Sequence, residues 1–166
     1  MKSASGTFVT VGNAKQPFNR MFELIRLAID LLPQPIIAQT GSAIVKIHGV
    51  KTFEILPGEH FKQLIKDSSV VIMHAGAGSL IHALNYLHKP IVIPRRYKYG
   101  EHIDDHQIQL AREFYIQDKI YLVENIIDMH QALSILKSSE IKNKFQDNET
   151  FKRKLITLLE NISLNK

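Results

Sequence analysis

Residues 70–79 read VVIMHAGAGS, an apolar run followed directly by glycines and small residues. The apolar run at 70–73 predicts a buried strand, and residues from about 78 to 87 predict the helix that follows it. Glycines allow a backbone to approach an anion closely, and the first turn of a helix offers unpaired N–H groups. We therefore expect this segment to hold a phosphate-bearing ligand, with these contact residues: His74, Gly76, Ala77, Gly78 and Ser79.

A second predicted strand, at 91–93, leads into a polar segment that continues to residue 107. Ligands of open α/β sheets bind at the carboxyl ends of the strands, so both polar segments should lie at one edge. The candidate ligand-binding residues of the second segment are Arg95, Glu101, His102, Asp105, His106 and Gln107. Gly12 and Asn13 follow the first predicted strand, at 8–12, and belong to the same edge.

Strand and helix patterns alternate along the whole chain. The expected strands are 8–12, 35–39, 45–47, 53–56, 70–73, 91–93 and 120–123, and the expected helices are 18–32, 57–66, 78–87, 105–114 and 126–136. This alternation is typical of an α/β fold with a Rossmann-like, doubly wound parallel sheet. Residues 148–164 predict an amphipathic helix, which ordinarily packs on its own sheet. We expect one domain over residues 1–166.

The composition narrows the classes of function. The 166 residues are 45% hydrophobic and contain no Cys, which excludes disulfides, thiolate metal sites and a cysteine nucleophile. No apolar run approaches the roughly 20 residues that span a bilayer, and the first residues lack the apolar stretch of a secretory signal, so a cytoplasmic location is expected. The net charge of +5 favours anionic ligands or surfaces. No recognisable nucleic-acid module is present, and we expect no nucleic acid partner.

Three motifs together resemble the C-terminal domain of glycosyltransferase family 28. They are HAGAGS at 74–79, KPIVIP at 89–94 and, above all, PRRYKYGEHIDDHQ at 94–107. The segments FVTVG at 8–12, PFNR at 17–20 and QTG at 39–41 fit the same group. The likeness is greatest to the small subunits of two-part bacterial exopolysaccharide and capsule glycosyltransferases. Those subunits are themselves similar to the catalytic subunit of the eukaryotic dolichol-diphosphate N-acetylglucosamine transferase.

This resemblance implies the donor-binding, C-terminal half of a GT-B glycosyltransferase. It implies a UDP-sugar as donor substrate, no tightly bound cofactor, and transfer of a hexose to a lipid-diphosphate-linked saccharide. The other half of the cleft would come from a separate, membrane-associated acceptor-binding subunit, without which the chain would be inactive. Such a chain would lie in the cytoplasm, at the inner face of the membrane through its partner. The 148–164 helix and the basic surface are available for that docking.

The resemblance also implies roles for some residues, beside which ordinary structural roles stay open. In the family, the segment matching Asp105, His106 and Gln107 meets the donor sugar, whereas an Asp at a helix start is commonly a cap. Arg95 offsets diphosphate charge or is simply exposed, and His74 contacts phosphate or bonds to nearby backbone. Inverting transfer needs a base. His74, His102 and Glu101 are candidates, but none is convincing, and the partner is the expected source.

Two other classes of function fit parts of the sequence. Residues Glu101, His102, Asp104, Asp105 and His106 are possible ligands of a metallohydrolase. Five groups within six positions cannot all converge on one ion, so no metal site is expected. A non-catalytic subunit that binds the donor or stabilises a partner transferase remains the other alternative. A dinucleotide-dependent oxidoreductase is disfavoured, because residues 11–15 supply one glycine where the fingerprint needs several.

Overall fold

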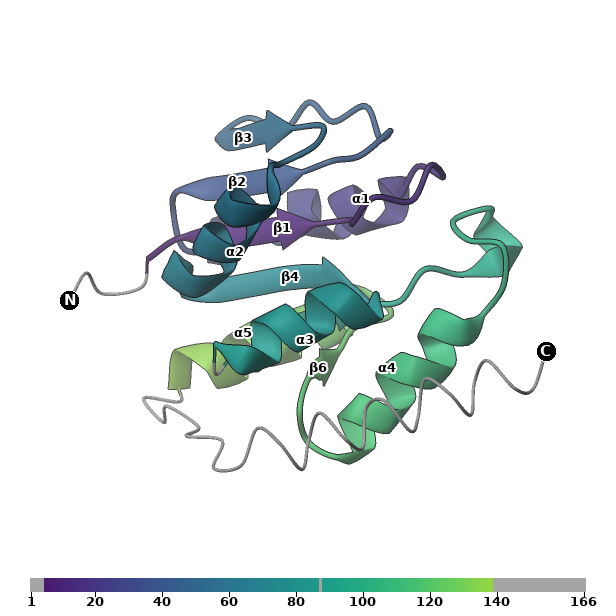
Figure 1. Ribbon diagram of the computed structural model, residues 1–166. Helices are drawn as coiled ribbons and strands as arrows, with labels where there is room; N and C mark the ends of the chain where they lie inside the picture. Colours follow the sequence, from purple (N-terminus) through teal and green to yellow (C-terminus); the bar gives the residue numbers. More distant parts are fainter. Residues whose placement is uncertain (1–4, 87, 139–166) are drawn as a thin grey trace.

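Six parallel strands form one sheet within residues 5–86 and 88–138, the part of the chain that the computed structural model describes (Figure 1). The strand order across the sheet is β3-β2-β1-β4-β5-β6. The strands are β1 Thr7–Thr10, β2 Ile36–Gln39, β3 Val50–Phe53, β4 Val70–His74, β5 Ile91–Ile93 and β6 Tyr121–Leu122. This arrangement confirms the expected Rossmann-like α/β fold.

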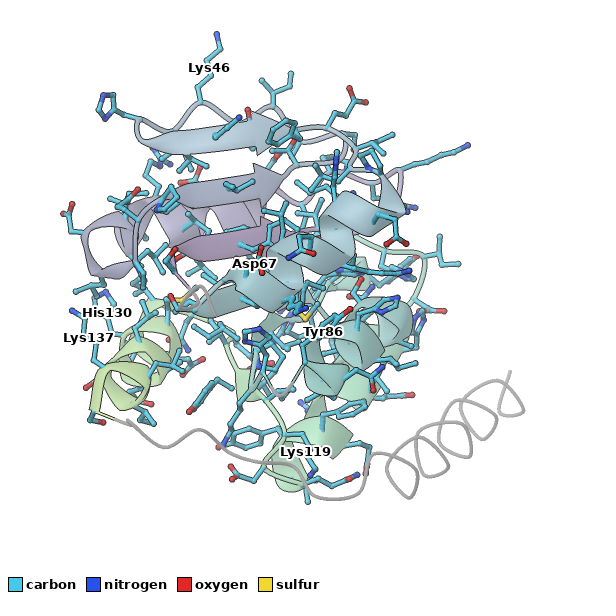
Figure 2. The ribbon with its side chains drawn as sticks, turned by 60° about the vertical axis from the view of Figure 1, so that its left-hand side comes forward. Lys46, Asp67, Tyr86, Lys119, His130 and Lys137 are labelled. Atoms are coloured by element: carbon cyan, nitrogen blue, oxygen red, sulfur yellow. The ribbon has the colours of Figure 1, made fainter. Side chains whose placement is uncertain are left out.

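Helices cover both faces of the sheet because the central strands are apolar on both sides. On one face, α1 (Asn19–Leu27) and α5 (Ile126–Ser138) pack over side chains such as Val9 and Ile72. On the other face, α2 (Gly58–Asp67), α3 (Ala77–Asn85) and α4 (His106–Ile116) pack over Phe8 and Val71. Figure 2 shows the side chains that fill the space between these layers. Burial of successive strand residues on opposite faces therefore holds the three layers together.

The direction in which the sheet grows reverses between β1 and β4. The chain proceeds from β1 to β2 and β3 towards one edge, and then returns to β4 on the other side of β1. Thr10 pairs with Met73, so the residues that follow β1 lie beside His74, the last residue of β4. In open α/β sheets the crevice for a ligand forms at the carboxyl ends of the strands at such a reversal point.

Two predicted elements differ from the structure. The strands expected at 45–47 and 53–56 are wrong, since the edge strand β3 is Val50–Phe53. Its side chains are mostly exposed, so the apolar signal that marks a central strand is missing. The helix expected at 18–32 ends at Leu27 and continues as a 3₁₀ turn, Ile29–Leu31. The N–H of Ala28 bonds to the carbonyls of both Leu24 and Ile25, which tightens the chain before Pro33.

The remaining expected elements are present, with ends that differ by at most two residues. The helix expected at 148–164 lies outside the described residues. In the part of the chain that is described, no helix combines the length and the apolar character needed to cross a bilayer.

Candidate functional site

His74 lies at the reversal point with its ring packed between two glycines. A Cβ atom added to Gly12 would lie 2.4 Å from Cε1 of His74, and one added to Gly76 would lie 2.1 Å from Nε2. Neither distance is sterically possible, so the ring occupies space that any other residue at position 12 or 76 would fill. Gly12 also has a φ of +71°, a left-handed conformation that glycine adopts at little cost.

The imidazole of His74 is buried and neutral. Burial, followed by the positive charge of Arg95, lowers the pKa of His74 to about 3. Its Nδ1 atom has no hydrogen-bond partner among the described residues. Leaving a buried polar atom unpaired costs about 1–3 kcal/mol. The ring therefore holds an unpaired polar atom, enclosed by protein, at the carboxyl end of β4.

The first turn of α3 follows His74 after two residues and is open to solvent. Gly76 is the residue before the helix, and no side chain caps the free N–H groups of the first turn. Gly78 is exposed, and a Cβ atom there would meet nothing within 4 Å. Packing within the described protein thus does not require glycine at position 78. The N–H groups of Ala77, Gly78 and Ser79, which form this turn, are therefore available to an anion.

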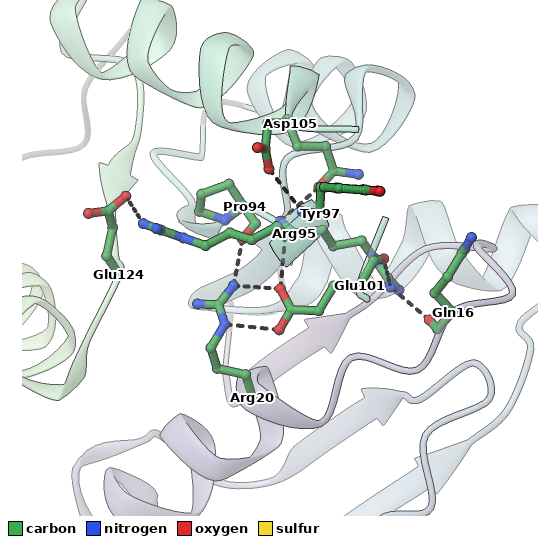
Figure 3. A network of polar contacts seen from close by, with 10 residues as sticks. Gln16, Arg20, Pro94, Arg95, Tyr97, Glu101, Asp105 and Glu124 are labelled. Carbon is green, nitrogen blue, oxygen red and sulfur yellow. Dashed lines mark hydrogen bonds and ion pairs between the residues drawn. The ribbon is translucent and has the colours of Figure 1, made fainter. Parts of the chain in front are cut away.

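Arg95 lies two residues after the end of β5 at Ile93, and its side chain is entirely buried. Its Nη1 donates to the carbonyls of Gln16 at 2.7 Å and Glu101 at 2.9 Å, and its Nη2 donates to the carbonyl of Val11 at 2.9 Å (Figure 3). This placement differs from both expectations, since the guanidinium neither reaches the surface nor faces an open ligand site. Arg95 instead ties together three segments that surround the carboxyl edge of the sheet. Burial lowers the pKa of Arg95 to about 10, so the side chain stays charged at neutral pH.

Glu101 is engaged with an arginine from the first helix. Arg20 donates to both carboxylate oxygens, at 2.9 Å and 2.8 Å, and the N–H of Arg96 donates to Oε2 at 2.9 Å. The Glu101 side chain is only 5% exposed. A carboxylate saturated in this way is poorly suited to accept a proton from a substrate hydroxyl. Gln107, also buried, accepts a hydrogen bond from the N–H of Arg95 at 3.2 Å and supports the same network.

Three of the other polar candidates come together in the turn before α4. Asp104 lies between His102 and His106, and one ligand atom from each of the three residues lies within 4.8 Å of the others. Burial and the neighbouring His106 lower the pKa of His102. Asp105 turns away and accepts a hydrogen bond from the N–H of Tyr97 at 2.9 Å. The five residues considered as metal ligands do not all converge, as expected, but His102, Asp104 and His106 do.

Asn13 joins a chain of polar contacts across the ends of β1 and β2. Gln39 donates from Nε2 to Oδ1 of Asn13 at 3.1 Å and accepts at Oε1 from the hydroxyl of Thr10 at 2.8 Å. The Thr10 hydroxyl oxygen accepts from the N–H of Gly12 at 3.1 Å. Asn13 is therefore held at the carboxyl edge of the sheet with its side chain exposed.

Sequence reasoning did not assign roles to several supporting residues: Thr10, Gln16, Arg20 and Gln39. Arg20 and Gln39 lie inside the quoted motifs PFNR and QTG, so their positions were visible. Their partners were not, because the Arg20 side chain meets a carboxylate 81 positions later. A polar residue at the last position of a strand or in the first turn of a helix is the signal that could have marked Thr10, Gln39 and Arg20.

Comparison with known proteins agrees with this architecture. The family model of the glycosyltransferase family 28 C-terminal domain matches residues 7–158. The glycotransferase of kitacinnamycin has a similar structure, with a TM-score of 0.62 and 14% identity, over 84% of this chain and 36% of that one. The solution structure of ALG13 is similar with a TM-score of 0.61 and 19% identity, over 92% of this chain and 96% of that one. No curated protein sequence gives a significant match.

Both structural likenesses are at low identity and show the shared fold alone. This chain spans only about a third of the glycotransferase of kitacinnamycin but nearly the whole of ALG13. The single sheet described above is therefore equivalent to one part of a larger protein in the first case and to almost a complete chain in the second.

Proposed function

This chain belongs to the family of glycosyltransferase family 28 C-terminal domains, and from that premise we propose that it binds a UDP-sugar and supplies the donor side of a hexosyltransferase. In this proposal the hexose passes to a lipid-diphosphate-linked saccharide of exopolysaccharide or capsule synthesis. A separate, membrane-associated subunit binds the acceptor and brings the complex to the inner face of the membrane.

The observation that carries the proposal is the pair of polar features at the reversal point of the sheet. His74 with its unpaired Nδ1 and the uncapped first turn of α3 lie at the carboxyl end of β4. The N–H groups of this turn can donate to phosphate oxygens, and the helix dipole adds partial positive charge. The Nδ1 atom of His74 is enclosed by protein, so in this proposal donor binding uncovers it, and the neutral imidazole then donates its one N–H.

The chemistry assigned to these groups is stabilisation of the leaving group. In an inverting transfer, an acceptor hydroxyl oxygen attacks the anomeric carbon while the bond from that carbon to UDP breaks. Negative charge then develops on the diphosphate, where the α3 N–H groups and His74 act. The hydroxyl proton must pass to a base. Glu101 is paired with Arg20, His74 is buried and His102 contacts Asp104, so in this proposal the partner subunit provides that base.

The partner is proposed for a geometric reason. The described sheet presents one row of strand ends, which lines one side of a cleft, whereas sugar transfer requires the donor and acceptor to be enclosed together. The net charge of +5 favours approach to an anionic membrane on which a lipid-linked acceptor resides.

The direct test is calorimetric titration of the protein with UDP and with several UDP-hexoses. We expect UDP binding that Gly78→Val abolishes, because the branched side chain fills the space over the first turn of α3. Gly58→Val is the matched control, since Gly58 also lies in a first helical turn with nothing within 4 Å of an added Cβ. Absence of UDP binding, both alone and with the partner subunit, would overturn the proposal.

The ion pair of Glu101 also favours a second candidate, a non-catalytic subunit that binds a donor or stabilises a partner transferase, while the partner holds the donor that reacts. Transfer assays with the partner distinguish the two. If Gly78→Val removes transfer, the donor reacts at this site. If transfer continues at the wild-type rate, the partner holds its own donor site and this chain has a supporting role.

A further inference from the structure

We propose that His102, Asp104 and His106 form a binding site for a divalent first-row transition-metal ion, with Zn²⁺ as the representative ion. His102 and Asp104 lie in the turn between the 3₁₀ segment Tyr97–Tyr99 and helix α4, and His106 is the first residue of α4. The site lies at the same edge of the sheet as His74, close enough for His102 to interact electrostatically with His74.

The geometry of the three donors matches what such an ion needs. Nδ1 of His102 lies 3.3 Å from Oδ1 of Asp104, and Nδ1 of His106 contacts the same oxygen. All three ligand atoms lie within 4.8 Å of one another. Bond lengths of about 2.0–2.1 Å to zinc place tetrahedral ligand atoms about 3.3 Å apart. For all three to reach one ion, the contact between His106 and Asp104 must lengthen and the more widely spaced ligand atoms must come closer.

The turn is held in place by contacts outside the three residues. Glu101, directly before His102, is clamped by Arg20, and Asp105 accepts from the N–H of Tyr97. The N–H of His106 donates to Oδ1 of Asp104 at 3.1 Å, which fixes that carboxylate at the start of α4. Ligands that are already oriented lose less conformational entropy when the ion binds.

The chemistry of the donors selects the class of ion. Two imidazoles and one carboxylate suit Zn²⁺, Co²⁺ and related ions, whereas Mg²⁺ and Ca²⁺ prefer oxygen ligands. The side chains of His102, Asp104 and His106 are 15%, 27% and 33% exposed, so solvent reaches the group. Three protein ligands leave at least one coordination position for water or for an oxygen of a bound anion.

The ring arrangement agrees with convergence on a common point. The centroids of His102 and His106 are 4.6 Å apart with the rings nearly perpendicular. This edge-to-face contact brings both Nδ1 atoms to the single carboxylate oxygen. An ordinary surface pair joins one imidazole to one carboxylate, whereas here two imidazoles contact the same carboxylate oxygen of Asp104.

The experiment is titration of chelator-treated protein with Zn²⁺ by calorimetry, together with the ligand-field absorption of bound Co²⁺. We expect one ion per chain, with affinity reduced at least 10-fold in Asp104→Asn and in His106→Gln. His130→Gln is the control, because His130 is an exposed histidine on α5, on the opposite face of the sheet (Figure 2). Its affinity should equal that of the wild type.

Equal Zn²⁺ affinity in the wild type and in Asp104→Asn would overturn the site. Circular dichroism of each variant shows whether it is folded, and the Co²⁺ spectrum of the wild type reports nitrogen and oxygen ligation without any mutation. A Co²⁺ spectrum identical to that of the aqueous ion also overturns the site. Neither measurement uses a nucleotide. A failure here leaves the UDP-sugar proposal standing, and a failure to bind UDP leaves the metal site standing.

Discussion

The imidazole of His74 lies so close to Gly12 that a Cβ atom on Gly12 would come within 2.4 Å of its Cε1. Gly76 approaches the other side of the same ring. The glycines of this region therefore have two different purposes. Gly12 and Gly76 make room for a buried histidine, whereas Gly78 leaves the first turn of α3 open on its outer side.

Gly12→Ala should destabilise the protein strongly. The new methyl group meets the His74 ring, and the φ of +71° disfavours a side chain. Overpacking costs about 1–3 kcal/mol and a left-handed conformation about 1–2 kcal/mol, so we expect a loss of about 2–4 kcal/mol in the free energy of unfolding. Gly78→Ala is the control and should be neutral or stabilising by up to about 1 kcal/mol. Urea denaturation measures both. Equal stability of the two variants would contradict this account.

Arg95→Lys should be costly although it keeps the positive charge. One ammonium group cannot reach the carbonyls of Val11, Gln16 and Glu101 together in the geometry of a guanidinium fork. Buried acceptors that lose their partners cost about 1–3 kcal/mol each, so we expect a loss of about 3 kcal/mol.

The neighbouring Arg96→Lys provides the comparison for Arg95→Lys. Arg96 forms an ion pair with Glu124 nearer the surface, a contact that lysine can replace. Its effect should stay within about 1 kcal/mol. Thermal or urea unfolding measures the loss of stability in both variants. Similar losses at the two positions would mean that Arg95 does not brace the three segments.

Arg20 and Glu101 should be strongly coupled energetically. In a double-mutant cycle with Arg20→Met and Glu101→Gln, we expect the double variant to lose less stability than the sum of the two single variants, with a coupling energy of about 1–3 kcal/mol. The reason is that each single variant leaves the other side chain without its partner in a largely buried site. The exposed pair Lys62 and Glu59 serves as the reference and should show a much smaller coupling. Comparable couplings would argue against a structural role for Glu101.

Stability should fall as the pH decreases below about 6.5 because of His74. The folded pKa is about 3, whereas the unfolded chain titrates near the ordinary value of 6.5. Between these values the unfolded state binds a proton that the folded state does not, which costs up to about 1.4 kcal/mol of stability per pH unit. From about pH 7 to about pH 5, we expect a loss of about 2 kcal/mol that His74→Asn does not show. Parallel urea denaturation of both proteins at the two pH values tests this. The same pH dependence in both would mean that His74 is protonated in the folded protein.

The local elements of this fold were accessible from the sequence because they depend on neighbouring residues. Apolar runs marked β4 and β5, and the start of α4 was correctly placed near residue 105. The edge strand β3 was missed because its exposed residues lack the pattern of buried strands. Proximity of the two polar segments also followed from the sequence, since parallel strands bring their carboxyl ends to one edge.

Apart from the edge strand β3, the sequence by itself determined the order of strands and helices, and it determined the glycine-rich turn and the family to which these motifs point. Only the tertiary structure decided what individual side chains do there. Arg95 became a buried brace, Glu101 an ion-pair partner of Arg20, and Gly12 a neighbour of His74 that lies 62 positions later in the chain. The physical reason is that backbone conformation follows from short-range periodicity and turn chemistry. Hydrogen-bond partners, burial and pKa shifts instead arise from residues distant in sequence, which meet only when the sheet is assembled.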